Sequence, residues 1–196
     1  MSKFKYLCIV PVNKENYQTE EQVVNGMPSI YWTIKYARES KRITKLLVVT
    51  NSKNVAKIVK SYGVDVLETN KRGKLIEFAI NEVESKNVVV LSPKVLIRYH
   101  EIIDECIRVF EEENADVLIS GEKRKKRDSF TKKKSYKPWF YASGCVEVYK
   151  TEFLFNGKKD ANKIQYKVPK EFNLEVQDAF DIASLDIIMK KLGISL

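Results

Sequence analysis

Apolar and polar positions follow one another in blocks that predict strands and helices in turn. Continuously apolar runs, rich in β-branched residues, predict buried strands over residues 6–11, 45–50, 64–67, 87–91 and 115–120. Apolar residues at helical spacing predict helices over residues 53–62, 73–84 and 97–113, and another that opens at residues 28–30. Because helices separate the strands, neighbouring strands are expected to pair in parallel through right-handed crossovers. The pattern therefore predicts a three-layer α/β/α sandwich with a mostly parallel sheet.

The pattern becomes more mixed in the last third of the chain. Residues 139–150 and 163–168 are strand-like, and residues 181–192 predict a closing helix. We interpret residues 138–168 as a small β-rich extension of the sandwich. Residues 122–137, which precede it, are interpreted as a basic mobile loop.

The formal charge of +9 is concentrated in one segment. Residues 123–137 hold nine Lys or Arg and one Asp, a local charge of +8 that leaves about +1 for the rest of the chain. A segment this rich in Lys, Ser and Thr is typical of a solvated loop. The same charge suits nonspecific binding of phosphates, so binding of nucleic acid or another polyanion stays open as the less favoured alternative.

Length and composition narrow the class of protein. A length of 196 residues suits one well-buried core, so residues 1–196 are predicted to form a single domain. No apolar run approaches the roughly 20 residues of a membrane helix, and the N-terminus lacks the long apolar stretch of a signal peptide. We therefore expect a cytoplasmic protein that has no membrane partner.

Cysteine and histidine usage argue against two kinds of site. Cys8, Cys106 and Cys145 are odd in number, widely separated and surrounded by apolar residues. This usage predicts reduced, buried thiols instead of disulfides or a metal cluster. His100 is the single histidine, which excludes a multi-histidine metal site and argues against a histidine-based catalytic triad.

The stretch NVVVLSPKVLIRYHE, residues 87–101, places polar and basic groups directly after a predicted strand. Open parallel sheets bind ligands in the crevice beyond the carboxyl ends of their strands. The loops that follow the predicted strands are therefore expected to line one rim of the sheet. Ser92, Lys94 and Arg98 on this rim are candidates for contact with an anionic or hydroxylated ligand.

Several stretches of the sequence resemble a known family. Residues 25–66, NGMPSIYWTIKYARESKRITKLLVVTNSKNVAKIVKSYGVDV, match N-G-K-P-L-I-x-Y-T-I, a strand ending S-T-D-S, and E-E-I-A-x-I-A-x-x-Y-G-A-E-V without a gap. Residues 91–98 resemble L-Q-P-T-S-P-L-R, and residues 142–154, ASGCVEVYKTEFL, resemble E-N-G-S-I-Y-V-F-K-R-E-F-L. The stretch LEVQDAFD, residues 174–181, falls where the family has E-x-x-D-I-D. These patterns are typical of the acylneuraminate cytidylyltransferases, the CMP-sialic acid and CMP-KDO synthetase family.

The resemblance implies a fold, an activity and partners. The fold would be that of the nucleotide-diphospho-sugar transferases, which is Rossmann-like, and the activity that of a divergent cytidylyltransferase. In this reaction a hydroxyl of a sialic-acid-like sugar acid attacks the α-phosphate of CTP and releases pyrophosphate, which needs positioning and charge neutralisation more than a covalent catalyst. A Mg²⁺ cofactor, the partners CTP and a sugar acid, and a homodimer formed through residues 138–168 are implied in the same way.

The phosphate-binding loop is the part of the sequence that departs most from the family. The family's P-A-R-S-G-S-K-G corresponds to PVNKENY here, residues 11–17, which contains no glycine and is followed by further glutamates that would repel a triphosphate unless a metal intervened. Asn13 stands where the family has Arg, so Lys14 is the implied catalytic residue facing the phosphates. The nucleotide-binding residues that the resemblance implies are Pro11, Asn13, Lys14, Lys71, Arg72 and Ser92.

The resemblance also implies a set of substrate-binding residues: Ser92, Lys94, Arg98, Ser143 and Gly144. Ser92 stands where the family has Gln, and Ser143 stands where it has a sugar-binding Asn. Arg98 has two rival roles, as an anchor for the loop that follows the strand or as a surface charge.

Two aspartates are the implied metal ligands. Asp178 occupies the first metal-binding position of the family and is also an implied catalytic residue. Phe180 occupies the second position, and Asp181 lies one residue further along. Acidic residues also favour the first turn of a helix, so the roles of metal ligand and helix start both stay open for Asp178 and Asp181.

Three functions follow from these observations. The first is a divergent cytidylyltransferase, which the retained positions favour. The second is a catalytically impaired member of the same family that binds nucleotide or sugar without turnover, which the missing glycines favour. The third is a binder of polyanions or nucleic acid through the basic segment.

Overall fold

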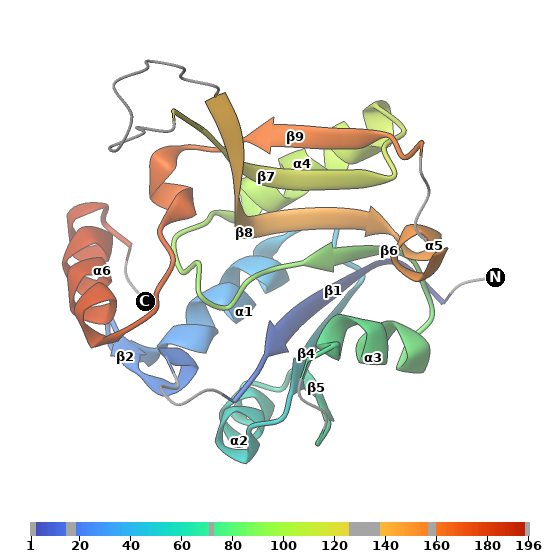
Figure 1. Ribbon diagram of the computed structural model, residues 1–196. Coiled ribbons are helices and arrows are strands. Elements are labelled where there is room, and N and C mark those ends of the chain that lie inside the picture. The colour runs from blue at the N-terminus through green and yellow to red at the C-terminus, as the bar shows by residue number, and fades with distance from the viewer. Residues whose placement is uncertain (1–2, 15–18, 71–72, 126–137, 157–159, 195–196) are drawn as a thin grey trace, which may run out of the picture.

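The computed structural model describes residues 3–14, 19–70, 73–125, 138–156 and 160–194 (Figure 1). Within these residues, the core is a seven-stranded sheet with the order β5-β4-β1-β6-β8-β7-β9. The strands are β1 (Phe4–Val12), β4 (Lys45–Thr50), β5 (Asp65–Glu68), β6 (Ser85–Val90), β7 (Val117–Lys125), β8 (Pro138–Lys150) and β9 (Lys163–Lys167).

Most neighbouring strands of the sheet run parallel. The pairs β1–β4, β1–β6, β4–β5 and β7–β9 are parallel, whereas β8 runs antiparallel to both β6 and β7. The prediction of a mostly parallel sheet is confirmed. The expectation that β7 continues the parallel pairing from β6 is wrong, because β8 returns from the end of β7 and fits between the two strands.

Helices cover both faces of the sheet (Figure 1). The helices α1 (Ser29–Glu39), α2 (Lys53–Ser61) and α4 (His100–Glu112) share one apolar cluster with the sheet, and α3 (Leu75–Glu82) and α5 (Thr151–Asn156) share the other. Successive side chains of a strand point to opposite faces, so both clusters draw on the same strands. In β1, Tyr6 and Cys8 belong to the first cluster, and Leu7 and Ile9 belong to the second. This explains why the strands are apolar throughout and confirms the three-layer α/β/α arrangement.

Short elements and a last helix complete the rim where β1 ends. The short elements are η1 (Thr19–Glu21), β2 (Val23–Val24), β3 (Met27–Pro28) and η2 (Lys170–Asn173). Helix α6 (Ala179–Lys191) lies next to β2, and its Leu185 and Met189 enter the larger apolar cluster (Figure 1). The buried ring of Trp32 donates its Nε1–H to the carbonyl oxygen of Val24 at 3.0 Å, which ties α1 to β2.

Two predicted boundaries need correction. The helix expected from residue 97 begins at His100, because Ile97 belongs to a buried irregular segment that packs without helical hydrogen bonds. The basic loop expected over residues 122–137 begins later, because β7 extends to Lys125 and pairs there with the start of β8. The remainder of that predicted loop, residues 126–137, lies outside the described residues.

The segment predicted as a β-rich extension, residues 138–168, is largely part of the sheet. Its first half is β8, an interior strand, and its end is β9, which pairs with β7 at the sheet edge. Its proposed part in a homodimer stays a prediction. The three cysteines are free and buried, as the sequence predicts. In the described part of the chain, no helix is both long enough and apolar enough to cross a membrane.

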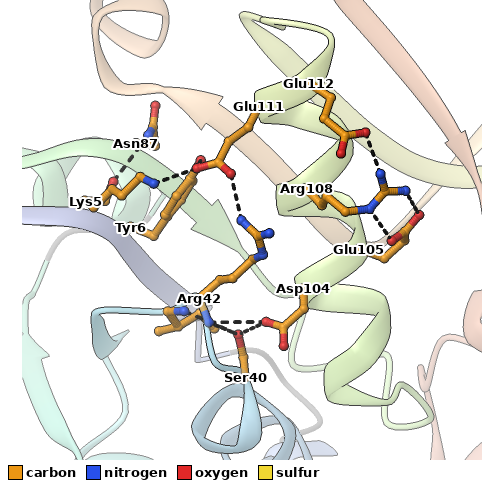
Figure 2. A network of polar contacts seen from close by, with 11 residues as sticks. Lys5, Tyr6, Ser40, Arg42, Asn87, Asp104, Glu105, Arg108, Glu111 and Glu112 are labelled. Carbon is orange, nitrogen blue, oxygen red and sulfur yellow. Dashed lines mark hydrogen bonds and ion pairs between the residues drawn. The ribbon is translucent and has the colours of Figure 1, made fainter.

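The amino end of the sheet is closed by a network of paired charges (Figure 2). Glu111, near the end of α4, accepts hydrogen bonds from the Tyr6 hydroxyl at 3.1 Å and from Arg42 Nη1 at 2.7 Å, and it pairs with Lys5 Nζ at 2.7 Å. Asp104 on the same helix accepts from the Ser40 hydroxyl at 2.5 Å. This end of the molecule therefore holds α4 to the turn between α1 and β4 by compensated charges.

Candidate ligand-binding site at the carboxyl ends of the strands

A pocket of about 190 Å³ lies beyond the carboxyl ends of β1 and β6. It is lined by Pro11, Asn13, Glu20, Val90, Ser92, Pro93, Lys94, Gly144 and Glu147. A second pocket of about 400 Å³ shares Pro11 and Asn13 with the first and extends along the start of α3, where Lys74 and Leu75 line it. The two pockets together occupy the rim that open parallel sheets use for ligands.

Strand pairing explains why residues far apart in the sequence meet at this pocket. Ile9 of β1 is paired with Val90 of β6, and Leu91 N–H donates to the carbonyl oxygen of Ile9 at 3.1 Å. The segments that follow β1 and β6 therefore begin next to each other at the same edge of the sheet. Of the residues predicted for nucleotide or substrate binding, the structure brings five together around the pocket: Pro11, Asn13, Ser92, Lys94 and Gly144.

The turn after β6 is held by hydrogen bonds to both backbone groups of Ser92. Its N–H donates to the carbonyl oxygen of Gly144 at 2.9 Å, and its carbonyl oxygen accepts from Arg98 Nη2 at 2.6 Å and from Val95 N–H at 3.4 Å. The Ser92 hydroxyl accepts from Lys94 N–H at 3.3 Å. The pocket side of this turn is therefore fixed in position before any ligand binds.

Gly144 faces this turn from β8, and two features of the structure favour glycine at this position. Its φ of +67° lies in the left-handed region that other residues rarely adopt. A Cβ atom at this position would lie 3.0 Å from Cβ of Ser92. A side chain here would thus displace the pocket wall.

Arg98 lies behind the pocket wall. Its relative exposure is 0 %, and its guanidinium donates to Ser92. These contacts are those of an anchor for the loop, which was one of its two rival roles in the sequence, and they argue against a surface charge. Direct contact between Arg98 and a substrate stays a prediction.

The other predicted contact residues are less close to the pocket. Ser143 is only 2 % exposed, and its hydroxyl accepts from Cys145 N–H at 3.3 Å. The backbone N–H of Lys14 donates to the side-chain oxygen of Asn51, and the Lys14 side chain is exposed. Lys71 and Arg72 lie outside the described residues.

The two aspartates form the start of α6. Asp178 is the N-cap residue, and its Oδ1 accepts from the N–H groups of Phe180 at 2.9 Å and Asp181 at 3.0 Å. Oδ2 of Asp181 accepts in turn from Gln177 N–H at 2.9 Å. The helix-start role of both residues is thus observed, and their role as metal ligands stays a prediction.

The residues just before α6 nevertheless contact the turn after β6, which lines the pocket. Val176 N–H donates to the carbonyl oxygen of Lys94 at 2.8 Å, and the backbones of Glu175 and Val95 form an isolated antiparallel β-bridge. Asp178 follows two residues later, and its Oδ2 accepts no hydrogen bond from the described residues. Within those residues no group of three or more acidic, His or Cys side chains could hold a metal ion. Mg²⁺ often relies on one or two carboxylates, substrate phosphates and water, so the described residues fit only a site of that kind.

Two carboxylates line the pocket. Glu20 was noted in the sequence only as a negative charge near the phosphate loop, and it is 3 % exposed here. Glu147 was missed, although a lone acidic residue in an apolar strand was the signal that could have found it. The Tyr149 hydroxyl donates to Glu147 Oε2 at 2.6 Å, and burial together with this carboxylate raises the pKa of Tyr149. The pocket therefore contains both signs of charge.

The sheet order, the helical layers and the rim pocket together define the fold of the nucleotide-diphospho-sugar transferases. Solved structures with this fold match almost the whole chain. The structure of CMP:2-keto-3-deoxy-manno-octonic acid synthetase complexed with CTP matches with a TM-score of 0.78 and 11 % identity, covering 96 % of this chain and 99 % of that one. The 4-diphosphocytidyl-2C-methyl-D-erythritol synthase of Anaerococcus prevotii matches with a TM-score of 0.68 and 12 % identity, covering 95 % and 99 %. No protein-family model matches the chain, and no curated protein matches it significantly.

Proposed function

We propose that this chain is a CTP-dependent nucleotidyltransferase that transfers CMP to a hydroxyl of a sugar acid and releases pyrophosphate. The observation that carries the proposal is the pocket between the ends of β1 and β6, which gathers five of the residues that the sequence assigns to binding. The fold likeness extends over 96 % of the chain to a synthetase whose structure contains CTP. A sialic-acid-like acceptor, the homodimer and the cytoplasmic location belong to the same proposal.

The reaction needs the acceptor hydroxyl, the α-phosphorus of CTP and the bridging oxygen of the leaving pyrophosphate to lie in line. The acceptor hydroxyl attacks the α-phosphorus of CTP, the bond to the bridging oxygen breaks, pyrophosphate leaves, and the hydroxyl proton passes to water. Lys14 and Lys94 supply positive charge to the phosphates, and Asn13 and Ser92 supply hydrogen bonds. A Mg²⁺ ion, when bound, would neutralise phosphate charge with Asp178 as its protein ligand.

The test is pyrophosphate release by the purified full-length protein with CTP, Mg²⁺ and a panel of eight- and nine-carbon sugar acids. We expect release with CTP and at least one of these acids, and much less with ATP, GTP or UTP. Omission of the acid controls for slow hydrolysis of CTP. Absence of release with every acid of the panel would contradict the proposed transfer.

A pair of substitutions separates the two roles of Asp178. Asp178→Ser keeps a good N-cap residue and removes the carboxylate, whereas Asp178→Ala removes both. If Asp178 holds Mg²⁺, both variants lose turnover by roughly tenfold or more and Asp178→Ser retains the wild-type stability. If Asp178 acts only as a helix cap, Asp178→Ser keeps full turnover.

Binding without turnover is the second candidate, and one observation favours it. The buried Glu20 lines the pocket next to a phosphate loop that has no glycine, which disfavours a triphosphate. A thermal shift with CTP or a sugar acid and no pyrophosphate release would identify this function. Binding of RNA with a steep salt dependence that is lost when the lysines of residues 123–137 are neutralised would instead identify the polyanion binder.

A further inference from the structure

Arg98 is a fully buried cation that has no counter-charge among the residues that the structure describes. Its relative exposure is 0 %, and no carboxylate pairs with it in the described part of the chain. Its one strong acceptor is the carbonyl oxygen of Ser92, at 2.6 Å from Nη2. Among the described residues, its Nε and Nη1 atoms find no hydrogen-bond partner. Buried charges are usually paired and fully hydrogen-bonded, so this arrangement is energetically unfavourable for the fold alone.

The ionisable neighbours of Arg98 do not compensate its charge. Those that act on it most strongly are the thiol of Cys145, which also accepts a hydrogen bond from the Arg98 guanidinium, the thiol of Cys8 and the phenol of Tyr36. Burial raises the pKa of the Cys8 thiol to about 12, raises that of Cys145, and raises that of Tyr36 to about 12, so all three are neutral near pH 7. Burial also lowers the pKa of Arg98, but a guanidinium stays protonated in proteins.

Arg42 shows how the same chain treats an arginine that serves stability. Arg42 Nη1 lies 2.7 Å from Glu111 Oε2, and the two side chains are 35 % and 32 % exposed (Figure 2). Its charge is compensated and partly hydrated, which is the usual arrangement. Arg98 has no exposed surface and, among the described residues, no counter-charge. It also differs from Arg42 in lying directly behind Ser92, a wall residue of the pocket.

We infer that Arg98 is a positioning residue whose unpaired charge draws the anionic part of a ligand, a phosphate or a carboxylate, into the pocket beside Ser92 while its guanidinium fixes the turn. The low polarisability of the interior screens such a charge much less than water screens a surface lysine. The charge therefore acts on the ligand without touching it. The inference rests on the proposed function only in taking this pocket as the anion site.

Three substitutions separate the charge of Arg98 from its anchoring contact. Arg98→Met removes both the charge and the donor, Arg98→Gln keeps an N–H donor for Ser92 but removes the charge, and Arg98→Lys keeps the charge. Arg42→Met is the matched control, because it removes an arginine of the same chain that is paired and lies at the other end of the sheet. The full-length variants are compared by urea unfolding and by calorimetric binding of pyrophosphate, CTP and uncharged cytidine.

We expect Arg98→Met and Arg98→Gln to bind pyrophosphate and CTP about tenfold more weakly, with unfolding midpoints equal to or above that of the wild type. Arg98→Lys is expected to stay within about threefold of the wild type, and cytidine affinity to change less than twofold in every variant. Arg42→Met is expected to lower the unfolding midpoint and leave all affinities within about twofold.

Four outcomes would overturn the inference. One is wild-type pyrophosphate affinity in Arg98→Gln, and another is an equal loss of cytidine and pyrophosphate affinity, which a purely structural role would produce. The third is failure of both neutral variants to fold, because the charge would then be required by the fold. The fourth is a wild-type protein that binds neither pyrophosphate nor CTP. A wild-type protein that binds both with the expected loss in Arg98→Gln, yet releases no pyrophosphate, supports this inference and contradicts only the proposed transfer.

Discussion

The two ends of the sheet treat charge in opposite ways. At the amino end, Lys5 and Arg42 converge on Glu111, so each charge has a counter-charge within hydrogen-bonding distance (Figure 2). At the carboxyl end, the buried Arg98 has no counter-charge among the described residues, and it lies behind Ser92, which lines the pocket. The paired end stabilises the contact between α4 and the turn that joins α1 to β4. On the inference drawn above, the uncompensated charge of Arg98 is available to an anionic ligand.

The largest expected effect comes from Gly144→Ala at the carboxyl end. The left-handed φ and the 3.0 Å approach to Ser92 together are expected to lower the free energy of unfolding by about 2 to 3 kcal/mol and to abolish detectable CTP binding. Urea unfolding and calorimetry measure the two effects. Gly193→Ala is the matched control, because Gly193 has a φ of +69° and no atom within 4 Å of the added Cβ. It is expected to cost only about 1 kcal/mol, and equal losses in both variants would contradict the crowding at Ser92.

Glu111→Ala should destabilise the amino end of the sheet without changing the affinity for the ligand. It removes the acceptor shared by Lys5, Tyr6 and Arg42, and because the side chain is about one-third exposed we expect a loss of about 1 to 2 kcal/mol in urea unfolding. CTP affinity is expected to stay within twofold of the wild type. Glu112→Gln, which disturbs only an exposed pair with Arg108, should cost less than about 0.5 kcal/mol. A loss of CTP affinity in Glu111→Ala would contradict the proposal that the amino end serves stability and the carboxyl end serves binding.

Glu111 at the amino end should contribute to the pH dependence of stability. Hydrogen bonds and ion pairs, above all with Lys5, lower the pKa of Glu111, so its contribution is present above the unfolded-state pKa and is lost as the pH falls through the folded-state value. Between about pH 5 and pH 3, the free energy of unfolding is expected to fall less steeply in Glu111→Gln than in the wild type. Urea unfolding at several pH values measures the two slopes. Identical slopes would show that Glu111 does not carry this dependence.

The smallest effects are expected from two exposed or half-buried lysines. Lys94→Met at the pocket should weaken CTP binding about threefold to tenfold and change the free energy of unfolding by less than about 0.5 kcal/mol. The Lys5 side chain is 60 % exposed in its pair with Glu111. Lys5→Met should therefore leave CTP binding unchanged and lower the free energy of unfolding by no more than about 0.5 kcal/mol. Calorimetry and urea unfolding compare them, and a reversed pattern would contradict the assignment of the two ends.

The strands and helices of the parallel half could be predicted because their signals are local. The strand Lys45–Thr50 has the predicted bounds, since its apolar run is bounded by polar residues on both sides. The start of α4 was misplaced, because Val95, Leu96 and Ile97 are fully buried outside any helix and look like its first turn in the sequence. The place of β8 depends on pairing between distant segments, which periodicity does not report.

The residues of the candidate site divide in the same way, into those that local sequence signals predict and those that depend on pairing between distant segments. Ser92 was predictable from the rule that ligands bind at the carboxyl ends of parallel strands. Glu147 was not, because it reaches the pocket only when β8 lies antiparallel beside β6, with Glu147 opposite Val90. The sequence also left the location of Arg98 open, because its burial depends on how the chain packs after β6.

Backbone amide chemical shifts of the labelled full-length protein, recorded as CTP is added, test the difference between the two ends in a single experiment. We predict saturable shifts at Asn13, Ser92 and Gly144, around the pocket, and none at Arg42 or Glu111. Shifts concentrated at Arg42 and Glu111, or no saturable shift at Asn13, Ser92 and Gly144, would contradict binding of the nucleotide at the carboxyl ends of β1 and β6.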